Sequence, residues 1–179
     1  MMIEQLSNPD PCRKKIESIF RSTNPFRDSG RDKFPVKAVL YPENGYHLNE
    51  RQFIALTETL DTLGEEGFFV SQVEAEIQNE MTRSWNWFCS SPSYDEYQEM
   101  PLVLENAHYS LNETWGILIS HEMHGLLVAQ KDFWDIFRSI YPIWDEDHAR
   151  FKERWEEIEE KPWYEGFLSG LTEIPSQSV

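Results

Sequence analysis

The stretch that decides the fold is Trp115-Gly116-Ile117-Leu118-Ile119-Ser120-His121-Glu122-Met123-His124-Gly125-Leu126-Leu127-Val128-Ala129. Two apolar runs, 115–119 and 126–129, flank a polar segment at 121–125 that is typical of a turn, with Gly125 as its permissive residue. Consecutive strands with so short a connection must pair antiparallel, because a parallel crossover needs about a dozen residues. The segment therefore predicts an antiparallel hairpin.

Outward from this hairpin, further strands and helices are predicted from apolar periodicity. The additional strands are expected at 36–41, 67–73, 85–89 and 102–104, and the helices at 10–20, 49–64, 131–141, 144–160 and 163–171. The segment 90–98 is rich in turn-forming residues and is expected to be irregular. Together these elements predict an α+β fold, a single domain with an antiparallel sheet of five or six strands packed with amphipathic helices.

The helix at 49–64 has the clearest boundaries. Asn49 can cap it and Gln52 occupies the capping-box position. Phe53, Leu56, Leu60 and Leu63 then recur at helical spacing before Gly64.

The domain organisation follows from the change in composition along the chain. Residues 1–35 contain one short helix and then a Pro/Gly/Ser-rich run, so we expect an N-terminal helix and a mobile arm. Residues 36–173 form the single α+β domain, and 174–179 form a polar tail. The N-terminus has no charged segment followed by an apolar run, and no window is long and apolar enough to span a bilayer. Two cysteines are too few for a disulfide scaffold, so the expected location is the cytoplasm, without membrane contact.

The net charge of −16 is unevenly distributed. Residues 1–40 hold 8 basic and 5 acidic side chains, a net charge of +3, which leaves −19 on the remaining 139 residues. Such a body repels nucleic-acid phosphates and favours a basic partner protein. Solubility alone is the other reason for such a charge. The densest acidic run lies on the outer face of the helix at 144–160.

The segment Ser120-His121-Glu122-Met123-His124 holds two imidazoles and a carboxylate, which suggests a metal site. The zinc-protease pattern, however, requires histidines four residues apart on a helix, and here the spacing is three within a strand–turn–strand context. A polar hairpin tip explains every one of these residues, so we prefer this interpretation to a metal site. The chain has no Gly-x-Ser-x-Gly elbow and no Gly-rich phosphate loop, so we expect no catalytic residue, metal or cofactor.

The segments Asn106–Ser110 and Trp115–Glu122, with His124 and Phe133, are similar to stretches in small uncharacterised bacterial proteins. Some of those proteins resemble immunity proteins of polymorphic-toxin systems. The resemblance covers only residues 106–133 and implies an acidic, non-catalytic domain that docks onto a cationic toxin domain. It implies no functional residue.

The leading functional hypothesis is thus a non-catalytic acidic domain that binds a basic partner protein, in the manner of an immunity protein. Two alternatives stay open: a small metal-dependent hydrolase using His121, Glu122 and His124, and a structural or assembly subunit of unknown oligomeric state. The expected binding residues lie near the hairpin and on the acidic helix: Trp115, His121, Glu122, His124, Asp145, Glu146, Asp147, Glu153, Glu156, Glu157 and Glu160.

Overall fold

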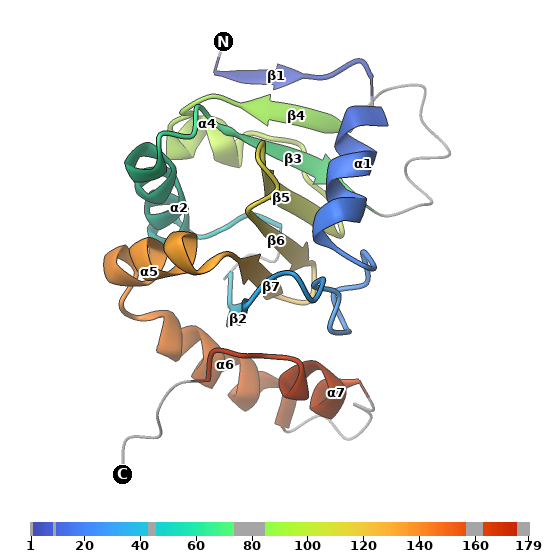
Figure 1. Cartoon of the computed structure of the whole chain (residues 1–179), viewed down its shortest axis with the longest axis vertical. Coiled ribbons are helices and arrows are strands. Elements are labelled where there is room, and N and C mark those ends of the chain that lie inside the picture. The colour runs from blue at the N-terminus through green and yellow to red at the C-terminus, as the bar shows by residue number, and fades with distance from the viewer. Residues whose placement is uncertain (1, 9, 43–45, 74–84, 157–162, 175–179) are drawn as a thin grey trace.

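The computed structural model describes residues 2–8, 10–42, 46–73, 85–156 and 163–174. These residues form one sheet of seven strands in the order β1-β4-β3-β5-β6-β7-β2, and all neighbouring strands are antiparallel (Figure 1). The predicted α+β fold is confirmed, with more strands than expected. The strands are β1 (Ile3–Gln5), β2 (Val36–Leu40), β3 (Phe68–Gln72), β4 (Asn86–Cys89), β5 (Asn106–Ser110), β6 (Trp115–Ser120) and β7 (His124–Ala129).

Helices cover both faces of the sheet. The described helices are α1 (Asp10–Ile19), α2 (Glu50–Leu63), α4 (Tyr94–Gln98), α5 (Lys131–Ile140), α6 (Trp144–Glu156) and α7 (Tyr164–Ser169). Side chains of α2, α4 and α5 pack with one face of the strands, and side chains of α1, α6 and α7 pack with the other. In Figure 1, α2, α4 and α5 accordingly lie on the opposite side of the sheet from α1. None of the described helices is long and apolar enough to cross a bilayer.

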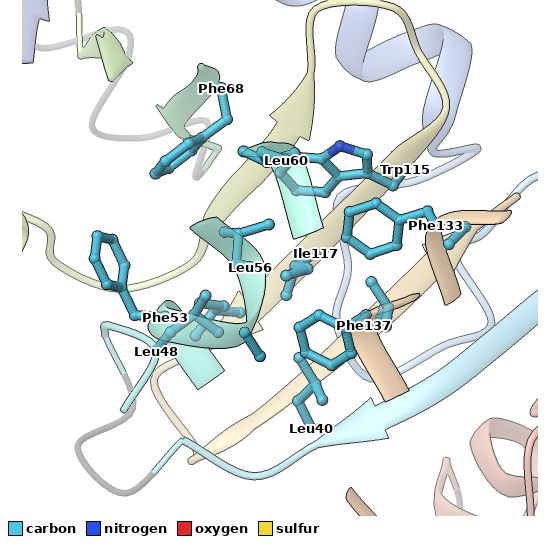
Figure 2. Close-up of a cluster of buried hydrophobic side chains, with 14 of the residues drawn as sticks. Leu40, Leu48, Phe53, Leu56, Leu60, Phe68, Trp115, Ile117, Phe133 and Phe137 are labelled. Atoms are coloured by element: carbon cyan, nitrogen blue, oxygen red, sulfur yellow. The ribbon is translucent and has the colours of Figure 1, made fainter. Parts of the chain in front are cut away.

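Strands β6 and β7 are buried on both faces, which explains their nearly continuous apolar sequence. Along β6, Trp115, Ile117 and Ile119 face the core beneath α2 and α5, whereas Leu118 faces the core beneath α1. Figure 2 shows the first of these cores, in which the ring of Trp115 stacks on Phe133 of α5 at a centroid distance of 5.0 Å. The hairpin predicted from the sequence therefore consists of two interior strands of the sheet, β6 and β7.

Helix α2 has the ends that its sequence predicts. The Asn49 side chain accepts a hydrogen bond from Gln52 N, and the Gln52 side chain accepts one from Asn49 N, which completes a capping box. At the other end Gly64 adopts a left-handed conformation with φ 69°. Helix α4 begins with a second capping box, formed by Ser93 and Glu96, in a segment where we expected irregular chain.

The prediction of a strand at 102–104 is wrong. Leu104 has φ 57°, a left-handed conformation that interrupts extended structure, and the strand of this region is β5 at 106–110. Polar residues on one face of β5 conceal it from an apolar pattern. His108, for example, is fully buried, and its Nε2 forms a hydrogen bond of 2.8 Å with the Tyr97 hydroxyl, which accepts another from Leu48 N.

The described residues before β2 contact the sheet through strand pairing and through buried side chains. Strand β1 pairs with β4 and forms one edge of the sheet. Ile16, Ile19 and Phe34 are buried in the same core as α6 and α7. The predicted helix at the N-terminus is present as α1, and the segment after it lies against the body. Of the expected polar tail, residues 175–179 lie outside the described residues.

Candidate functional site

The β6–β7 turn was the first candidate site, and its backbone is that of a tight hairpin. Ser120 pairs with His124, and Met123 N donates a hydrogen bond of 3.1 Å to Ser120 O. Met123 takes the left-handed conformation, with φ 68°, whereas Gly125, expected to supply it, lies inside β7. The Ser120 hydroxyl accepts a hydrogen bond from Glu122 N. The turn is therefore held by its own polar groups.

His124 is buried in the interior and cannot form part of an interaction surface, in contrast to the prediction. Its Nε2 donates a hydrogen bond of 3.0 Å to Pro25 O. Its ring is surrounded by five aromatic rings, those of Phe26, Phe151, Trp155, Trp163 and Phe167. Burial lowers the pKa of His124 to about 4, so the imidazole is neutral at pH 7. This residue joins α6, α7 and the segment after α1.

His121 is directed elsewhere and is partly exposed. Its Nδ1 lies 2.8 Å from Glu105 Oε1, and its Nε2 lies 3.5 Å from Glu122 Oε1. Glu122 also lies 3.8 Å from Arg154 Nη2 on α6. Over the described ranges, no three His, Cys, Asp or Glu side chains are placed to hold a metal ion together. Of the residues of the hydrolase alternative, His121 and Glu122 contact each other, whereas His124 is directed into the interior.

Trp115 is also misplaced by the sequence prediction, because it is fully buried between the sheet and α5. Phe68 and Phe133 contact it on either side, as Figure 2 shows. A large aromatic ring in this position stabilises the core rather than a complex.

The acidic face predicted on α6 is only partly present. Asp145, Glu146, Glu153 and Glu156 are exposed, as expected, whereas Asp147 is buried and Glu157 and Glu160 lie outside the described residues. Three cations are interleaved with these carboxylates: Arg150, Lys152 and Arg154. Lys152 forms an ion pair of 3.4 Å with Glu156. The described part of α6 therefore has 5 acidic and 3 basic residues and a net charge of only −2.

Asp147 links three parts of the fold. Gln52 of α2 donates a hydrogen bond of 2.7 Å to one carboxyl oxygen, and the Tyr141 hydroxyl donates one of 3.1 Å to the other. Only 2% of the residue is exposed. Burial raises the pKa of Asp147 to about 6, because the charged form loses its hydration.

The Asp147 carboxyl group also borders a cleft of about 360 Å³ between the start of α2 and α6. Arg51 and Arg150 line this cleft together with Glu50 and Glu146. Because both signs of charge are present, the lining favours neither a cationic nor an anionic ligand.

Negative charge is more concentrated on α2, α4 and α5, which cover the face of the sheet opposite α6. Residues 50–66, 93–99 and 131–140 belong to α2, α4, α5 and their flanking segments, and they contain 10 acidic and 3 basic side chains, a net charge of −7. We call their carboxylates the acidic helical face: Glu50, Glu58, Asp61, Glu65, Glu66, Asp95, Glu96, Glu99, Asp132 and Asp135. All are exposed except Glu65, which is half-buried. Lys131 forms an ion pair of 3.1 Å with Asp135 at one end of this surface.

The segment 10–33, on the other side of the sheet, has the opposite charge. It contains 7 basic and 4 acidic residues, a net charge of +3. Two of its cations are paired with acids of the same segment, Arg13 with Glu17 and Arg21 with Asp32. A basic segment therefore lies on the face of the sheet opposite the acidic helical face, where it is accompanied by α6 with its net charge of −2.

The acidic helical face was not predicted from the sequence, although the excess of acidic residues in its segments can be counted there. Acidic residues far outnumber basic ones in the segments 50–66 and 93–99, but these segments lie far apart in the chain, and only the fold brings them to one side together with α5, whose two acidic and two basic residues balance. Comparison with models of protein families, with curated proteins and with solved structures gives no match. The function must accordingly be argued from the surface itself.

Proposed function

We propose that this chain is a non-catalytic protein-binding domain that docks a basic partner protein on the acidic helical face. The observation that carries the proposal is the net charge of −7 on these segments, which have ten carboxylates, nine of them exposed, and three cations. Such a surface attracts cations over distances of about a Debye length and raises the rate of encounter with a basic partner.

The middle of α2 also offers apolar contact area on this face. Ile54 is 42% exposed and lies on the same stripe of the helix as Glu58 and Asp61, at spacings of four and seven residues. A complex needs such contacts to persist, because exposed charges mainly accelerate association whereas buried apolar contacts slow dissociation. The combination supports a docking surface more than it supports charge for solubility alone.

An immunity-type role is the specific form of this function that we propose. The resemblance of residues 106–133 to immunity-type proteins supports it, together with the excess of exposed carboxylates on the acidic helical face. The partner would then be a toxin domain with a positively charged surface.

A synthetic octalysine peptide tests the location of the binding surface. One variant removes four charges from the acidic helical face (Glu58→Gln, Glu66→Gln, Glu99→Gln, Asp132→Asn), and a matched variant removes four exposed charges from α6 and α7 (Asp145→Asn, Glu146→Gln, Glu153→Gln, Glu165→Gln). Calorimetry at low salt should show a loss of affinity of about tenfold in the first variant and a much smaller loss in the second.

Two results would overturn the proposal. Equal losses in both variants would mean that binding follows total charge and has no preferred face. Absence of octalysine binding to the unmodified chain at low ionic strength would mean that the surface is not a cation-docking surface at all.

A further inference from the structure

A pocket of about 220 Å³ lies within the acidic helical face, between the second half of α2 and the segments that flank β3 and β4. Its apolar lining comes from Leu60, Phe68 and Pro92, and its acidic lining comes from Asp61 and Glu65. Thr57 contributes a hydroxyl group. Among the described residues that line it, none is a lysine, an arginine or a histidine.

The backbone and the side chain of Glu65 are both held in place. Gly64 turns the chain in its left-handed conformation, and Glu65 N then donates a hydrogen bond of 2.9 Å to Leu60 O. Ser110 donates a hydrogen bond of 3.0 Å to Oε2 of Glu65, and Thr114 donates one of 3.1 Å to Oε1. These bonds position the carboxyl group before any ligand arrives, and Oε2, which among the described residues accepts only the bond from Ser110, can accept a further one.

Asp61 faces the same pocket from the last turn of α2 and is exposed. The described lining of the pocket thus combines two acidic residues with three apolar ones and contains no basic residue. Its volume is below the roughly 300–1,000 Å³ that is usual for small-molecule sites. It is suited instead to one long side chain with an aliphatic stem and a cationic end.

We propose that this pocket receives a single lysine or arginine side chain of the basic partner, with the stem against Leu60 and Phe68 and the cationic group between Asp61 and Glu65. The inference rests on the proposed function and adds to it the residue type at the centre of the interface. Charge-assisted hydrogen bonds to a positioned carboxylate are stronger than pairs between two mobile surface groups, so this contact should dominate over the surrounding charges.

The direct test uses small probes and NMR. N-acetyl-lysine methylamide and N-acetyl-arginine methylamide are titrated into ¹⁵N-labelled protein, with N-acetyl-norleucine methylamide as the uncharged control of similar length. At least one cationic probe should give saturable shifts at the amides of Gly64, Glu65, Gly67 and Ser91, and the norleucine probe should not. Shifts spread evenly over the acidic helical face, or equal shifts with norleucine, would overturn the inference.

Single variants then separate this pocket from the rest of the face. Asp61→Asn should weaken the cationic probe about tenfold, and Asp132→Asn, which removes an exposed charge from α5, should leave it unchanged. Asp61 is exposed, so its variant should fold, whereas Glu65→Gln also disturbs the contacts with Ser110 and Thr114 and serves only as a second measurement.

Octalysine binding separates the pocket inference from the proposed function. If the peptide binds but Asp61→Asn costs no more affinity than Asp132→Asn, the pocket inference is wrong and the proposed function stands. If the peptide does not bind at low salt, the proposed function itself fails, and the amino-acid probes still report on the pocket.

Discussion

Raising the pH from 5 to 7 should destabilise the fold through one buried carboxyl group, that of Asp147. The pKa of this group rises from 3.8 to about 6 on folding, chiefly because burial removes its hydration. A shift of about two pH units corresponds to about 3 kcal/mol of unfolding free energy in total. Between pH 5 and 7 the linkage relation gives a loss of about 1.3 kcal/mol.

The sign follows from proton binding. Between pH 3.8 and 6 the folded protein keeps the proton on Asp147, whereas the unfolded chain has released it. The stabilisation is therefore complete below the unfolded pKa and is lost as the pH rises through the folded value. The hydrogen bonds from Gln52 and Tyr141 favour the charged form and reduce the shift without abolishing it.

Urea unfolding, followed by tryptophan fluorescence at several pH values between 5 and 7, measures this contribution. Other carboxylates titrate over the same range, so the quantity of interest is the difference between the unmodified protein and Asp147→Asn. That difference should change by about 1.3 kcal/mol in favour of the variant as the pH rises. Asp145→Asn, which removes an exposed carboxyl group from the same helical turn, is the matched control.

A constant difference for Asp147→Asn across the range would refute the reasoning, because it would mean that Asp147 titrates alike in the folded and unfolded chains. A carboxyl ¹³C titration that places the pKa of Asp147 below 4.5 would refute it directly.

Two further predictions concern packing and capping. A Cβ added at Gly116 would lie 2.7 Å from Ile19 Cγ2 and 2.8 Å from Phe20 Cζ, so Gly116→Ala should cost about 1–3 kcal/mol in urea unfolding. Gly125→Ala, with its nearest atom at 3.5 Å, should cost much less, and equal losses would contradict the close approach of α1 to β6. Asn49→Ala should lower the unfolding free energy by about 1 kcal/mol through loss of the N-cap, whereas Asn49→Ser should retain most of it; a neutral alanine variant would show that the cap contributes nothing.

Local signals in the sequence determined several elements. Asn49 and Gln52, which cap α2, lie within four residues of each other, and the strands β6 and β7 are joined by a short turn. Neighbouring residues therefore suffice to predict both the helix start and the hairpin. Helix α5 and strand β2 were likewise predicted, because the apolar residues that indicate each of them lie close together in the sequence.

Other strands depend on partners far along the chain. Strand β1 contains a single apolar residue and forms through backbone pairing with β4, more than 80 residues away. Strand β5 has Asn106, His108 and Ser110 on a buried face, where His108 bonds to Tyr97 and Ser110 bonds to Glu65. An apolar pattern cannot reveal such a strand, because its polar groups are satisfied by residues outside it.

The sequence by itself determined the α+β class, the antiparallel hairpin and the excess of acidic residues. Only the tertiary structure decided which side chains face solvent. Trp115, His124 and Asp147 were expected on a surface and lie in the interior, while the carboxylates of α2, α4 and α5 gather on one side of the sheet. The physical reason is that periodicity reports contacts within one element, whereas burial and surface charge arise where separate elements meet.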